Sequence, residues 1–170
     1  MNYNIAILGL IEIVSAVTIG IFILAITYKI LQWVGRRYYK ISESNLAYSI
    51  FTASIMFSVG FMINEVIQPL ISSFRLLNQD AASYVLALRY IGQGAVYIAI
   101  AYCASIVIAL LSTSLYARLT PIDEFEEIRK NNVGIAIIIG SIIITLTLLT
   151  KSGVGLLIES IIPYPQLPPK

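Results

Sequence analysis

The sequence predicts an all-α integral membrane protein with four transmembrane helices, arranged as two tandem helical hairpins of the same orientation. Of its 170 residues, 58% are hydrophobic and only 12% are charged, and the mean hydropathy is +0.87. Such a chain has too little polar surface to cover a soluble domain of this size. Four apolar stretches are long enough to cross a hydrocarbon core of about 30 Å. The second and fourth stretches also share a pattern of polar and small residues.

The four helices are expected wherever roughly 20 or more apolar residues follow one another. We place them near 5–32, 46–73, 91–117 and 133–158. The first stretch is too long for a cleaved signal peptide and lacks a basic segment before it, so we expect it to remain as a membrane anchor. Residues 75–90 are expected to add a helix at the membrane surface. The proline-rich tail, residues 163–170, favours extended polyproline geometry.

The basic residues predict how the chain is oriented. They concentrate in the first and third connections, at Lys29, Arg36, Arg37, Lys40, Arg118, Arg129 and Lys130, whereas Arg75, Arg89 and Lys170 lie on the opposite side. Loops rich in Lys and Arg face the cytoplasm. Both chain termini are therefore expected outside the cytoplasm.

A shift of 87 positions superimposes the second predicted helix on the fourth, which predicts two repeated units, residues 1–85 and 86–170. The paired positions are Asn45 with Asn132, Ala47 with Gly134, Ser49 with Ala136, and Ala53 with Gly140. Small residues let helix backbones approach closely in lipid, so we expect these positions to pack helices together. The third helix carries a similar series at Ala95, Ala99 and Cys103. Each asparagine is expected to cap its helix or bond to a neighbour, or alternatively to bind a ligand or ion.

The segment before Asn132 predicts a short amphipathic helix at the cytoplasmic surface. Thr120 is expected to cap it, with Pro121 in its first turn. Its apolar face would carry Ile122, Phe125 and Ile128, since they recur at a spacing of three. Its acidic residues, Glu124, Glu126 and Glu127, would form either a solvated face or a docking site for a basic partner or a divalent cation.

The stretch "LTPIDEFEEIRKNNVGIAIIIGS", residues 119–141, resembles the signature of the YjfL-type bacterial inner-membrane proteins, and residues 40–54 carry a weaker version of it. In that family an acidic or polar stretch precedes an asparagine, and alternating small residues then enter a membrane helix. This chain has Asn131 where the family usually has glycine. The resemblance implies a four-helix protein of the bacterial inner membrane, built from duplicated two-helix units. It supplies no catalytic residue, because the family's function is unknown.

Three ionisable residues fall inside the predicted helices: Glu12, Glu65 and Lys151. A charge at this depth is costly unless it is paired or hydrated, so we expect Lys151 to pair with one or both carboxylates. The pair would be either a structural bridge or part of a proton or cation site lining a polar cavity. Helix-weakening residues stand close by, with Pro69 after Glu65, and glycines after Lys151.

Composition and motifs leave two classes of function. The chain has no histidine and a single cysteine, Cys103, so the commonest general base is absent and a disulfide within the chain is excluded. We find no catalytic, cofactor-binding or metal-binding motif and expect no enzyme, and a net charge of +2 does not suggest nucleic acid. The first class is a structural or interaction subunit in contact with membrane lipids, self-associating or built into a larger membrane complex. The second is an ion or proton channel or transport subunit that uses Glu12, Glu65 and Lys151.

Overall fold

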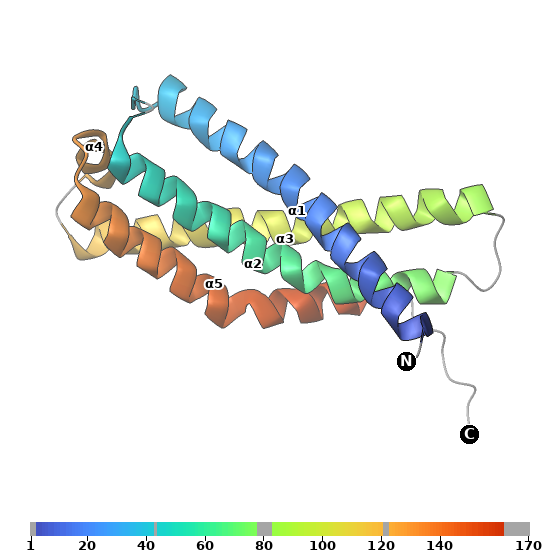
Figure 1. Ribbon diagram of the computed structural model, residues 1–170. Coiled ribbons are helices and arrows are strands. Elements are labelled where there is room, and N and C mark those ends of the chain that lie inside the picture. Colours follow the sequence, from blue (N-terminus) through green and yellow to red (C-terminus); the bar gives the residue numbers. More distant parts are fainter. Residues whose placement is uncertain (1–2, 43, 78–82, 121–122, 162–170) are drawn as a thin grey trace.

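The computed structural model describes residues 3–42, 44–77, 83–120 and 123–161, with backbone alone at 3–8, 11–12, 15, 71–77 and 83–90. Within these ranges the chain is helical and has no strand (Figure 1). The helices are α1 (Tyr3–Arg37), α2 (Leu46–Leu77), α3 (Ser83–Leu119), α4 (Glu124–Arg129) and α5 (Val133–Ile161). All but α4 are long and apolar enough to cross a membrane. The predicted all-α class, with four helices long and apolar enough to cross a membrane, is therefore confirmed. The predicted proline-rich tail lies outside the described residues.

One predicted element is wrong. The described residues of the range 75–90 do not form a separate surface helix, because residues 75–77 belong to α2 and residues 83–90 belong to α3. Pro69 lies inside α2 without ending it. Proline removes one backbone donor, but in lipid every other backbone polar group still needs an internal partner, which favours continuing the helix.

The long helices pack into a core of three with a fourth at the side. Helices α2 and α5 lie side by side, and α3 packs against both of them (Figure 1). Helix α1 packs against α2 and, within the described residues, against no other helix. Many of its apolar side chains are consequently exposed, among them Ile21, Phe22 and Trp33. In a membrane these side chains meet lipid or another helix.

Contacts between α2 and α5 recur from Ser54 to Glu65 along α2 and from Gly140 to Gly155 along α5, and we call this contact the α2–α5 seam. Ser54 packs on Gly140, the Ser58 and Thr147 hydroxyl oxygens lie 2.7 Å apart, and Lys151 Nζ lies 3.0 Å from Glu65 Oε1. The two hydrogen-bonded pairs join residues 89 and 86 positions apart. A nearly constant offset means that the two helices run parallel, as two hairpins of the same orientation require. The sequence repeat itself stays a prediction.

The two ends of the bundle differ in which helix termini lie there. Helices α2 and α5 begin at the same end, next to α4, and we call this the asparagine end because Asn45, Asn131 and Asn132 lie there. Helix α1 begins and α5 finishes at the opposite end (Figure 1). The last turn of α1 carries Arg36 and Arg37 at the asparagine end, where positive charge interacts favourably with the helix dipole.

Candidate functional site

Asn45 connects the start of α2 to the end of α4. Its Oδ1 accepts a hydrogen bond of 2.7 Å from the Tyr48 backbone N–H, which caps α2. Its Nδ2 donates to the carbonyl oxygens of Ile128 at 2.8 Å and Arg129 at 3.1 Å. These carbonyls belong to the last turn of α4, where the usual i+4 helical donors are absent, and the Ile128 carbonyl also accepts from Asn131 N–H. The buried Asn45 therefore bonds to terminal backbone groups of two helices at once.

Asn131 adds a second cap to α2 from the neighbouring turn. Its Oδ1 accepts a 2.9 Å hydrogen bond from the Ala47 backbone N–H. Its φ is 67°, in the left-handed region, and backbone bonds run from Asn131 N to Ile128 O and from Asn132 N to Glu127 O. This is a Schellman ending of α4, in which the left-handed position is most often glycine and sometimes asparagine. Asn131 thus adopts the left-handed conformation that glycine most often takes at this position of a helix ending, and it supplies a cap as well.

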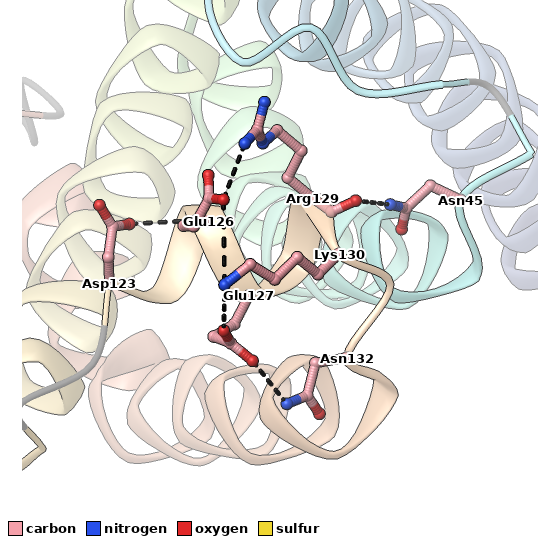
Figure 2. A network of polar contacts seen from close by, with 7 residues as sticks. All are labelled: Asn45, Asp123, Glu126, Glu127, Arg129, Lys130 and Asn132. Carbon is pink, nitrogen blue, oxygen red and sulfur yellow. Dashed lines mark hydrogen bonds and ion pairs between the residues drawn. The ribbon is translucent and has the colours of Figure 1, made fainter.

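Asn132 fastens the start of α5 to the acidic side of α4 (Figure 2). Its Nδ2 donates to Glu127 Oε2 at 2.9 Å, and its Oδ1 accepts a longer bond of 3.4 Å from Ile135 N–H. Glu127 also accepts from Lys130 Nζ at 3.0 Å. The hydrogen bond from Asn132, followed by that from Lys130, lowers the pKa of Glu127 below its ordinary value. We call Asn45, Asn131 and Asn132 together the asparagine clasp.

A second ion pair lies beside the clasp. Arg129 donates to Glu126 Oε1 at 2.7 Å, and this hydrogen bond is the main reason why the pKa of Glu126 is lowered and that of Arg129 is raised. Glu124, by contrast, is buried on α4. The three glutamates predicted as one acidic face therefore do not converge on a single docking or cation site.

The predicted cap of α4 is wrong by three residues. The Thr120 hydroxyl donates to the Tyr116 carbonyl at the end of α3, so it is already engaged. Asp123 caps α4 instead, and its Oδ1 accepts from Glu126 N–H at 3.0 Å. The apolar side of α4 behaves as expected, because Phe125 stacks on Tyr39 with ring centroids 4.2 Å apart and Ile128 is fully buried. Residues 121 and 122 lie outside the described part of the chain.

The predicted small-residue positions divide into two groups. Ala47, Ala136 and Gly140 are buried inside the bundle. A Cβ at Gly140 would overlap the Ser54 side chain, so the close contact of α2 and α5 depends on this glycine. Ser49, Ala53 and Gly134 are exposed in the single chain.

Two of the three predicted intramembrane charges meet. Lys151 Nζ donates to Glu65 Oε1 at 3.0 Å, and each side chain keeps part of its surface exposed. Glu65 also packs against α5 at Gly155, where a Cβ would come within 3.2 Å of Oε2. Glu12 lies in α1, but its side chain is outside the described part.

Some structural residues have no signal that we recognised in the sequence. In the sequence, Asn131 was notable only because the resembling family usually has glycine there. An asparagine pair directly before a membrane helix is nevertheless compatible with a left-handed turn at the first asparagine and a helix cap at the second. The contact between Gly35 of α1 and the Tyr48 ring is another example, since a Cβ at Gly35 would overlap that ring. The Tyr48 hydroxyl also donates to the Leu31 carbonyl. Such pairings join helices whose relative rotation no local pattern reveals.

Comparison with known proteins finds a family match in the second half of the chain. Residues 89–162 match the model of a family described as a domain of unknown function, DUF350. The matched range takes in most of α3 together with α4 and α5, and it nearly coincides with the second predicted unit. Neither a curated protein nor a solved structure matches the chain. Residues 89–162 are thus similar to a family of unknown function, in a chain with four helices long and apolar enough to cross a membrane.

Proposed function

We propose that this chain is a structural or interaction subunit of the bacterial inner membrane, a YjfL-type protein without enzymatic activity, which self-associates or joins a larger membrane complex. The asparagine clasp supports a structural role, because most of its polar atoms are used to hold α2, α4 and α5 together. The basic residues of the asparagine end favour placing that end in the cytoplasm and both termini outside.

The observation that carries the proposal is an apolar groove between α1 and α3. It has a volume of about 490 Å³ and includes Phe22 and Ile26 on α1 and Ala95 and Ala99 on α3. Exposed alanines one helical turn apart allow the backbone of another helix to approach closely, which drives helix association in lipid. A helix of a second copy of this chain fits this surface, because each copy presents the same small residues.

Cys103 provides a direct test, because it follows Ala99 by one turn, is exposed and is the only cysteine in the chain. We expect mild oxidation of native membranes to give a disulfide-linked dimer through Cys103. The matched control replaces Cys103 by Ala and Leu149, an exposed residue of α5, by Cys, and it should remain monomeric. Equal cross-linking of both proteins, or none in either, would contradict association through this groove.

The Glu65–Lys151 pair supports a second candidate function, an ion or proton pathway. Between this pair and the asparagine end, the α2–α5 seam is filled by Val59, Ile139 and Ile143, all fully buried. A pathway would therefore require these helices to separate.

If the pathway exists, Glu65→Gln should lower proton or cation flux in reconstituted vesicles at least about tenfold, since the charged group would be lost. Ser49→Ala, an exposed change on the same helix, serves as the control. Undiminished flux in Glu65→Gln, or no flux in the unaltered protein, would eliminate the pathway at this residue.

A further inference from the structure

A second and larger groove runs along α2, with a volume of about 710 Å³. Leu24 of α1 and the α2 side chains Met56, Phe57 and Phe61 make much of its lining apolar. Polar side chains contribute at one place, where Asn64 of α2 and Lys151 of α5 line the groove. The groove is thus apolar over most of its length and polar toward one end of the bundle.

The polar part lies about one hydrocarbon thickness away from the asparagine end. Lys151 is about 27 Å from Val133 along α5, and Asn64 is about 27 Å from Leu46 along α2, at 1.5 Å of rise per residue. A hydrocarbon core of about 30 Å that starts near the asparagine end would finish close to these two residues. The apolar lining, from Ala53 to Phe61, then lies within the hydrocarbon.

The charge that faces this groove is positive. Glu65 holds the Lys151 ammonium at 3.0 Å, but Glu65 itself does not line the groove and packs toward Gly155. An ammonium has three donor hydrogens, and within the described residues Lys151 uses one of them, for Glu65. The Asn64 side chain is exposed and makes no hydrogen bond to the described part of the chain. The groove therefore offers unused donors from an ammonium and an amide, with no carboxylate among its described lining residues.

We propose that this groove binds an anionic phospholipid, with its phosphate at Lys151 and Asn64 and an acyl chain along Phe57 and Phe61. Charge-assisted hydrogen bonds from an ammonium to phosphate are strong, especially near a low-dielectric boundary. The apolar length of the groove matches an acyl chain and not a free phosphate. The ion pair with Glu65 then has a positioning role, since it keeps the ammonium at the mouth of the groove.

The test measures which lipid stays bound. The full-length protein is placed in nanodiscs with equal amounts of phosphatidylglycerol and phosphatidylcholine that carry identical acyl chains, and retained lipid is read by native mass spectrometry. We expect about tenfold enrichment of phosphatidylglycerol on the unaltered protein, which corresponds to ~1.4 kcal/mol. The double variant Glu65→Gln/Lys151→Gln should lose this enrichment, because it removes the ammonium without leaving an unpaired carboxylate in the membrane.

Two further variants separate binding from folding. Asn64→Leu should reduce the enrichment while leaving thermal stability unchanged, since Asn64 is exposed and makes no described side-chain bond. Lys151→Arg should keep the enrichment because it keeps the charge. Equal retention of both lipids by the unaltered protein would overturn the proposal. It would also be overturned if soluble glycerol phosphate displaced the lipid, or if a Phe57→Cys/Cys103→Ala chain, in which position 57 carries the only cysteine, cross-linked to a second copy through this groove.

Discussion

Gly140→Leu should destabilise the protein by about 3 kcal/mol, because the α2–α5 seam has no room for a side chain at this position. A Cβ there already overlaps Ser54, and Gly140 itself is buried. Leucine would have to push the two helices apart, which would also separate the Ser58 and Thr147 hydroxyls. The free energy of unfolding can be measured in detergent micelles by titration with a denaturing detergent, followed by circular dichroism.

Gly153→Leu is the matched control, since it makes the same substitution in the same helix. No atom lies within 4 Å of a Cβ built at Gly153, and the residue is exposed. Its free energy of unfolding should stay within about 0.5 kcal/mol of the unaltered protein. If the two leucine variants were equally stable, Gly140 would not be needed for the close approach of α2 and α5.

Asn45→Ala should lower the free energy of unfolding by about 3 kcal/mol, because three hydrogen bonds of the clasp are lost together. The change removes the cap at Tyr48 N–H and leaves the Ile128 and Arg129 carbonyls without their side-chain donor. We expect the same unfolding titration to show the loss, and hydrogen exchange to show faster exchange of the Tyr48 amide.

Asn132→Ala tests whether the two asparagines are equivalent. Asn132 occupies the position paired with Asn45 in the predicted repeat. Its side chain, however, bonds only to Glu127 of α4 and Ile135 of α5 among the described residues, and it is only partly buried. We expect a loss of about 1 kcal/mol, typical of a single cap. Equal losses for both variants would mean that the bonds from Asn45 to α4 add nothing beyond capping α2.

The sequence predicted the four long helices because length and hydropathy alone decide which segments can cross a membrane. It also pointed to Asn45, Asn132 and Gly140, since asparagine at a helix start and glycine within a membrane helix have few other uses. It did not foresee that Thr120 would bond back to α3 and leave the cap of α4 to Asp123. Both residues are good caps, and only the path of the chain between α3 and α4 selects one of them.

What the sequence determined by itself was therefore local: where the four long helices lie, where α2 and α5 start, and which residue types occur within those helices. The sequence predicted that Lys151 pairs with one or both carboxylates, and the tertiary structure showed that Glu65 is one of them. The tertiary structure alone decided that Asn131 caps α2, and that α1 packs on α2 while α3 packs on both α2 and α5. These outcomes depend on how each helix is rotated and displaced against its neighbours. In lipid that choice follows from close packing and polar contacts summed over whole helix faces, and no short stretch of sequence contains that sum.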